Sequence, residues 1–197
     1  MNPSLPTDEL LWHRLTDGEE AAFTQLFERY YAALLGYGKS FLNDSDRVQD
    51  CVQDVFADIW LYRSSLNEPT SVKAYLLSCV RKRVARFHSR DRIFRQTTSL
   101  DHIEFSISFT VEDRLIANEE TALRIHHLNR QINALPPRQK EILFLRYHQG
   151  LTTEQVAEIL SINYQSASNL LHRALMQLRR ELKGNVALFL LLFSDLV

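Results

Sequence analysis

The sequence predicts an all-α protein, and three observations lead to this fold class. The chain of 197 residues contains only five glycines and five prolines, the residues that most often interrupt helices. Apolar residues recur every three or four positions over long stretches, which is the period of an amphipathic helix, whereas the alternation typical of strands is scarce. With 45% hydrophobic residues the chain can bury a core, and its length suits one domain or two small ones.

The apolar periodicity predicts helices near residues 8–16, 19–42, 45–63, 70–90, 115–134, 138–148, 153–160 and 164–183. A domain boundary is expected at residues 96–114, QTTSLDHIEFSISFTVEDR, where apolar and polar residues alternate from Ile103 to Val111. A single strand has nothing to pair with. We therefore expect an extended linker whose apolar side docks on a domain or on a partner. The alternative is a short edge strand within an otherwise helical fold.

The helix expected near 45–63 carries a row of carboxylates, here called the acidic stripe: Asp46, Asp50, Asp54 and Asp58, flanked by Gln49 and Gln53. Carboxylates four residues apart on a helix repel each other by a few tenths of a kcal/mol. Four in a row therefore favour a basic partner, with a merely solvated face as the alternative. A metal site is disfavoured because no histidine joins the stripe, and Mg²⁺ or Ca²⁺ prefers shaped loops or substrate phosphates.

The helix expected near 70–90 has the opposite charge. Residues 73–95 contain eight Lys or Arg and one acid, whereas residues 43–60 contain five Asp and one Arg. The net charge of −1 therefore hides two opposed patches. Opposite the apolar stripe lies the basic face: Tyr75, Lys82 and Arg86, bordered by Arg83 and Arg90. A ring beside several cations suits single-stranded nucleic acid. A solvated face, or contact with an anionic membrane, is the alternative.

The stretch LTTEQVAEILSINYQSASNLLHRAL, residues 151–175, predicts two helices joined by a short hinge. Thr152 and Gln155 fit a capping box, and Asn163 suits the N-cap of the second helix. One face of that helix is apolar, and the other carries Gln165, Asn169, His172 and Met176, flanked by Ser168, Arg173, Arg179 and Arg180. These side chains suit a helix in the major groove of DNA. An αα-hairpin with a solvated polar face is the alternative.

Other classes of function are disfavoured. No Gly-rich phosphate loop, HExxH or GxSxG motif is present, so neither an enzyme nor a small-molecule substrate or cofactor is expected. His126 and His127 diverge on a helix and cannot share a metal. Cys51 and Cys79 lack metal or disulfide spacing, which indicates buried thiols in a reducing cytosol. The N-terminus shows no signal peptide.

Several of these segments together resemble the extracytoplasmic-function (ECF) subfamily of the sigma-70 family of bacterial transcription initiation factors. The run DCVQDVFADIW resembles sigma region 2, and SVKAYLLSCVRKRVARF resembles its promoter-melting and −10-reading helices. The run from INALPPRQKEI to MQLRREL resembles sigma region 4 over its full length. The resemblance covers residues 8–90 and 118–183. It implies region 2 over 1–95, a linker over 96–117, region 4 over 118–184 and an apolar tail over 185–197.

The resemblance also implies a cytoplasmic protein with three sets of binding residues. Core RNA polymerase would bind Asp50, Gln53, Asp54 and Asp58. The opened −10 promoter element would bind Tyr75, Arg81, Lys82, Arg83, Arg86 and Arg90. The −35 element would bind Gln165, Ser168, Asn169, His172 and Arg173. An anti-sigma protein is a further expected partner.

The chain departs from the family pattern at several positions. Ser161 stands in the hinge where Gly is common, and Lys82 stands where Asn is frequent. Ser168 and Leu170 stand where family members often carry Lys or Arg, which predicts weak intrinsic affinity for the −35 element. The alternative function is a sigma-like adaptor or anti-sigma decoy that binds polymerase or inhibitor without reading DNA.

The tail contains eight apolar residues from Val186 to Phe193. As a helix they would span only about 12 Å, too short for a bilayer. We expect the tail to pack back on region 4, or alternatively to form part of the contact with an anti-sigma protein.

Overall fold

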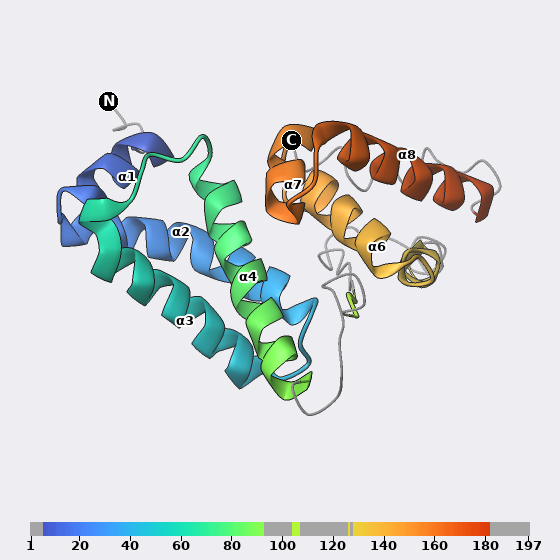
Figure 1. Ribbon diagram of the computed structural model, residues 1–197, viewed down its shortest axis with the longest axis horizontal. Helices are drawn as coiled ribbons and strands as arrows, with labels where there is room; N and C mark the ends of the chain where they lie inside the picture. Colours follow the sequence, from blue (N-terminus) through green and yellow to red (C-terminus); the bar gives the residue numbers. More distant parts are fainter. Residues whose placement is uncertain (1–5, 93–103, 107–125, 127, 182–197) are drawn as a thin grey trace, which may run out of the picture. The chain divides into compact units, whose positions relative to one another are not determined.

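The computed structural model describes residues 6–92, 104–106, 126 and 128–181, and at 88–92 it describes the backbone alone (Figure 1). The chain divides into two compact units, residues 1–97 and 98–197. Within the described ranges all regular structure is helical, which confirms the predicted all-α class. None of the helices in these ranges has the length and apolar character that crossing a membrane requires.

The first unit is a bundle of helices. α1 covers Asp8–Thr16, α2 Glu20–Lys39, α3 Ser45–Tyr62 and α4 Val72–Arg92, with a short 3-10 turn at Arg63–Ser65. α2 packs against α1, α3 and α4, and α3 packs along α4 (Figure 1). One face of each helix supplies the core, which includes Leu11, Leu15, Leu26, Leu34, Val48, Val52, Leu76, Leu77 and Val80.

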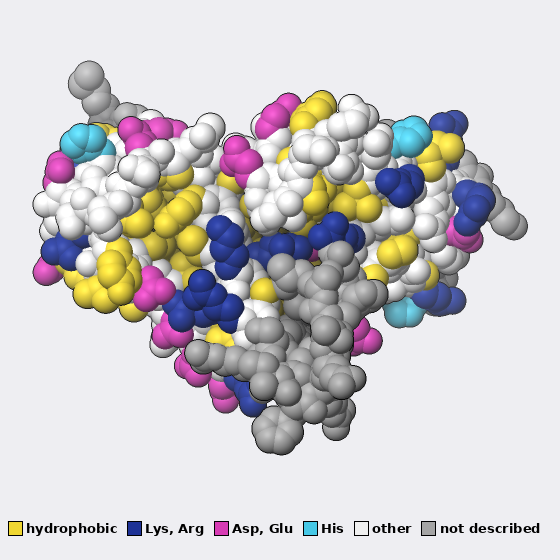
Figure 2. Space-filling view, viewed as in Figure 1, with side chains coloured by type: hydrophobic (Ala, Val, Ile, Leu, Met, Phe, Trp, Pro, Cys, Tyr) yellow, Lys and Arg dark blue, Asp and Glu magenta, His cyan; other side chains and the backbone are white. Residues whose placement is uncertain are grey.

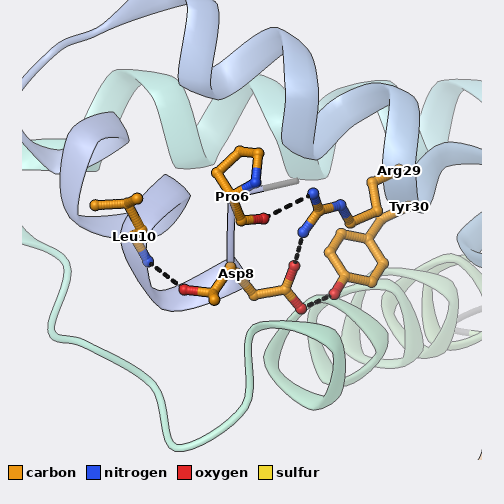
Figure 3. Close-up of polar contacts among 6 residues, drawn as sticks. Pro6, Asp8, Leu10, Arg29 and Tyr30 are labelled. Atoms are coloured by element: carbon orange, nitrogen blue, oxygen red, sulfur yellow. Dashed lines mark hydrogen bonds and ion pairs between the residues drawn. The ribbon is translucent and has the colours of Figure 1, made fainter. Parts of the chain in front are cut away.

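Polar side chains determine where α1 begins and how it attaches to α2. Thr7 caps α1 by accepting a hydrogen bond from the Leu10 amide at 3.4 Å. The Asp8 carboxylate accepts hydrogen bonds from the Arg29 guanidinium and the Tyr30 hydroxyl on α2 (Figure 3). Burial raises the pKa of Tyr30, and its hydrogen bond to Asp8 raises it further, so the hydroxyl keeps its proton. α1 is therefore fixed to the bundle at its first turn.

α2 and α3 approach each other closely at Gly38. A Cβ atom added at this position would lie 2.6 Å from Cγ1 of the buried Val48. Such a contact is shorter than atoms in a packed core tolerate, so a larger residue would fit only if Val48 or the helices shifted. At this point α3, which carries the acidic stripe, packs closely against α2.

The second unit contains the helix-turn-helix. Residues 126 and 128–133 are helical, α6 covers Pro137–Leu143, α7 Thr153–Leu160 and α8 Tyr164–Glu181. α6 and α7 both pack against α8 (Figure 1). The core between them includes Leu128, Ile132, Ile142, Leu143, Val156, Ile159, Leu160, Ala167, Ala174 and Leu178.

The helix predicted over 138–148 is interrupted. α6 ends at Leu143 and is followed by a π-helical turn, Phe144–His148. The turn forms because the Gln149 amide donates to the Phe144 carbonyl, five residues back, at 3.0 Å. The Leu151 amide then bonds the Leu145 carbonyl at 3.2 Å. These longer-range bonds widen the end of the helix, a feature that apolar spacing alone does not reveal.

Part of the predicted linker packs on the second unit. Phe105 is 1% exposed, and its ring meets Phe144 edge to face with centroids 5.8 Å apart. Residues 104–106 belong to no strand, which argues against an edge strand at that point. Phe105 therefore docks on the second unit, as expected for an apolar residue of the linker. The rest of the linker, the predicted helix before residue 126 and the tail lie outside the described residues.

Candidate polymerase and nucleic-acid surfaces

The acidic stripe lies on the solvent side of α3, as predicted. Its four carboxylates, and Gln53 beside them, are exposed. The opposite face is buried in the bundle through Val48, Val52, Val55, Phe56 and Ile59. α3 begins at a cap, since Asp44 accepts hydrogen bonds at 3.2 Å from the amides of Asp46 and Arg47. The stripe is therefore carried by a helix whose start and inner face are both fixed.

The basic face of α4 is present in the structure. Lys82 and Arg86 are exposed, and Tyr75 and Arg83 are partly buried. Arg81, which the resemblance assigns to the −10 element, is only 5% exposed and lies outside the exposed basic face. The reason is helical spacing, because Arg81 follows the buried Leu77 by four residues and shares its side of the helix. The side chain of Arg90 lies outside the described residues.

Arg83 joins the two charged surfaces. Its Nη1 lies 3.3 Å from Oδ2 of Asp54, and its Nη2 bonds the carboxylate of Asp58. The same Nη2 also lies 3.5 Å from the main-chain oxygen of Asp54. Figure 2 shows acidic and basic side chains next to each other on this unit. The acidic stripe and the basic face are therefore adjacent surfaces that share one guanidinium.

A pocket of about 180 Å³ opens where α3 and α4 diverge. It is lined by Val55, Asp58, Ile59, Tyr62, Leu66, Tyr75, Cys79, Lys82, Arg83 and Arg86. The pocket combines two aromatic rings, apolar side chains, three cations and one carboxylate. That combination suits an unstacked base with its phosphates, since bases stack on rings and phosphates pair with cations.

Neither cysteine is activated for chemistry. Burial raises the pKa of Cys51 to about 11 and also raises the pKa of Cys79. A raised pKa keeps the thiol protonated and unreactive at neutral pH. No cluster of His, Cys, Asp or Glu among the described residues could hold a metal ion.

Tyr75 is supported from behind by Trp12 of α1, a contact that sequence reasoning missed. The rings meet edge to face with centroids 5.3 Å apart at 76°. The indole N–H of Trp12 donates to the main-chain oxygen of Asn67, next to the pocket residue Leu66, at 3.3 Å. Burial raises the pKa of Tyr75 to about 12, so its hydroxyl stays neutral. In the sequence, Trp12 is one apolar residue of an amphipathic helix, a pattern that indicates core packing and not a role beside the pocket.

The helix-turn-helix has the predicted caps. Thr152 Oγ1 accepts from the Gln155 amide at 3.3 Å, and Gln155 Oε1 accepts from the Thr152 amide at 2.9 Å, which completes the capping box. Asn163 Oδ1 accepts from the Ser166 amide at 2.7 Å at the start of α8. Ser161 between the helices has φ of 55° and ψ of 45°, the left-handed conformation that favours glycine.

The polar face of α8 is exposed as predicted at four of its five candidate residues. Gln165, Asn169, His172 and Arg173 are exposed, and Ser168 is partly buried. Asn169 links two of them, because its side-chain oxygen accepts from Gln165 Nε2 at 3.2 Å and its carbonyl accepts from Arg173 Nε at 3.4 Å. Hydrogen-bonding groups on an exposed second helix can reach base edges in a major groove.

An open groove of about 670 Å³ runs beside the end of α8. It is lined by Gln139, His172, Arg173, Met176, Gln177, Arg179 and Arg180. Its cationic lining continues the polar face of α8 and suits a phosphate backbone.

Two segments of the chain match family models. Residues 26–93 match Sigma-70 region 2, and residues 126–178 match Sigma-70, region 4. The RNA polymerase sigma factor YlaC of Bacillus subtilis (strain 168) is 23% identical over 167 residues, which cover 80% of this chain and 90% of that protein. The ECF RNA polymerase sigma factor SigK of Mycobacterium tuberculosis (strain ATCC 25618 / H37Rv) is 23% identical over 186 residues, which cover 90% and 95%.

Solved structures share the fold. CnrH, solved in complex with the cytosolic domain of CnrY, superposes with a TM-score of 0.59 at 20% identity, covering 90% of this chain and 97% of that one. The sigma factor RpoE from Bartonella quintana, solved in complex with the anti-sigma factor NepR, gives a TM-score of 0.56 at 20% identity, covering 82% and 96%.

Proposed function

Because the chain belongs to the ECF subfamily of the sigma-70 family, we propose that it binds core RNA polymerase and directs transcription from specific promoters. The family is not a class of enzymes, so this function consists of binding and positioning. Such a protein acts in the cytoplasm, because RNA polymerase and promoter DNA are found there. An anti-sigma protein is the expected inhibitor, because the related RpoE of Bartonella quintana was solved with one.

The observation that supports this proposal best is the pair of charged surfaces on α3 and α4. A row of exposed carboxylates gives a docking surface for a basic element of the polymerase through Asp50, Gln53, Asp54 and Asp58. Beside it, the pocket with Tyr75, Lys82, Arg83 and Arg86 suits single-stranded promoter DNA. A protein that needed only one of these partners would not need both surfaces.

The polar face of α8 is assigned to the −35 element. Gln165, Asn169, His172 and Arg173 can reach base edges or phosphates, and Ser168 lies at the margin of this face. The face has one arginine among these five residues, which predicts modest intrinsic affinity. This scarcity of cations favours the second candidate, a sigma-like adaptor or decoy. The cation-rich pocket on α4 favours the sigma factor, since a decoy does not need to hold melted DNA.

Transcription tests the proposal directly. Core RNA polymerase of the source bacterium would be incubated with fragmented genomic DNA, with and without this protein. We expect new discrete transcripts whose start sites reveal both promoter elements. Tight binding to core polymerase without new transcripts would overturn the proposal in favour of the decoy. Lys82→Ala with Arg86→Ala serves as the matched control, because it removes DNA contacts but leaves the acidic stripe intact.

A further inference from the structure

Arg83 faces two competing demands if the proposed function is correct. The acidic stripe that would bind polymerase holds its guanidinium through Asp54 and Asp58. The pocket that would bind DNA has the same guanidinium in its wall. An arginine with both carboxylates bound has few N–H groups left to offer a phosphate.

Local charge makes this arrangement unfavourable for DNA. One guanidinium with two carboxylates carries a net charge of −1, and Asp58 itself lines the pocket. This edge of the pocket therefore repels a phosphate, although Lys82 and Arg86 attract one from the other side.

The exposure of the three side chains shows how polymerase could change this balance. Arg83 is 22% exposed, whereas the carboxylates of Asp54 and Asp58 are 53% and 58% exposed. A basic partner approaching from solvent therefore reaches the carboxylates while Arg83 lies behind them. Ion pairs that are partly exposed are weak enough to be exchanged for others.

We propose that Asp54 and Asp58 are positioning residues that withhold Arg83 from DNA in the unbound protein, and that a basic surface of the polymerase releases Arg83 by taking over both carboxylates. This inference rests on the proposed function and adds a link between its two binding surfaces. Docking on polymerase then switches one wall of the DNA pocket from acidic to basic.

The test measures binding of a fluorescein-labelled oligothymidylate to the full-length protein without polymerase, at low ionic strength. Asp54→Asn with Asp58→Asn should free Arg83 and raise the affinity by up to about fivefold, the upper end of the range expected for partly exposed ion pairs. Adding Arg83→Gln to this variant should cancel the gain. Thermal melting of each variant checks that the bundle is intact.

The matched control is Asp46→Asn with Asp50→Asn. It removes the same charge from the same stripe, and no ion pair joins either residue to Arg83 in the described part of the chain. We expect less than half of the gain from this pair. An equal gain in the control, no gain in the test variant, or a gain that persists with Arg83→Gln would overturn the coupling. Transcription by the wild-type chain would show that the proposed function survives that failure.

Discussion

The indole of Trp12 contacts the ring of Tyr75 edge to face, with the centroids 5.3 Å apart. Tyr75 lies in the wall of the pocket that we assign to melted DNA, whereas Trp12 is 1% exposed and lies in the core. The hydrogen bond from Trp12 to the Asn67 carbonyl ties the chain next to the pocket to the same indole. α1 therefore supports Tyr75, the aromatic member of the basic face.

Trp12→Phe tests this support. Phenylalanine keeps a ring against Tyr75 but cannot donate to Asn67, so we expect the free energy of unfolding to fall by about 1–3 kcal/mol. Binding of oligothymidylate should weaken, while binding to core polymerase stays unchanged. Leu15→Ala is the control, since it opens a cavity elsewhere along α1. Equal loss of DNA binding in both variants would mean that Trp12 acts only through the stability of the core and not through its contact with Tyr75.

Charge reversal tests the polymerase surface. Asp50→Lys with Asp54→Lys should abolish binding to core polymerase, because two attractive contacts become repulsive. Both carboxylates are exposed, so helical content should not change and the stability should change by only about 1 kcal/mol. Pull-down with core polymerase measures the effect. Asp17→Lys with Glu28→Lys changes the net charge equally outside the stripe, and equal loss there would point to a general charge effect.

The salt dependence of DNA binding tests the basic face. Lys82→Ala with Arg86→Ala removes two cations from the pocket wall. If both contact phosphates, the slope of log affinity against log salt for single-stranded DNA should become shallower by about 1.4. Titrations of oligothymidylate at several salt concentrations give this slope. An unaltered slope would remove both residues from the DNA site.

The hinge between α7 and α8 is strained at Ser161. Its positive φ is unfavourable for any residue with a Cβ, so Ser161→Gly should stabilise the helix-turn-helix by about 1 kcal/mol. Slower hydrogen exchange of amides in α7 and α8 would show the gain. Ser161→Ala keeps the Cβ and should bring no such gain. Equal protection in the two variants would mean that the strain is already relieved.

Local signals in the sequence predicted much of the fold. Thr152, Gln155 and Asn163 act as the caps that their residue types indicated, because capping depends on neighbours within one turn. The predicted helix from 19 to 42 ends earlier, at Lys39, and the next helix begins after the cap at Asp44. Helix ends depend on a few hydrogen bonds that apolar spacing does not encode.

Contacts between helices could not be predicted in the same way. The pairing of Arg83 with Asp54 depends on how α3 and α4 pack, as does the contact of Trp12 with Tyr75. Arg81 shows a different difficulty. The resemblance assigned it to the −10 element, but its spacing of four residues from the buried Leu77 places it on the buried side of α4. The assignment of DNA and polymerase contacts to individual residues stays a prediction.

The shared guanidinium has a consequence for the order of events in initiation. If polymerase binding raises the affinity for DNA by some factor, thermodynamic linkage requires that DNA raise the affinity for polymerase by the same factor. When the melted strand leaves the pocket, Arg83 again competes for Asp54 and Asp58. The affinity for polymerase then falls when the promoter is released. The exchangeable ion pair would therefore favour dissociation of the protein from polymerase after initiation.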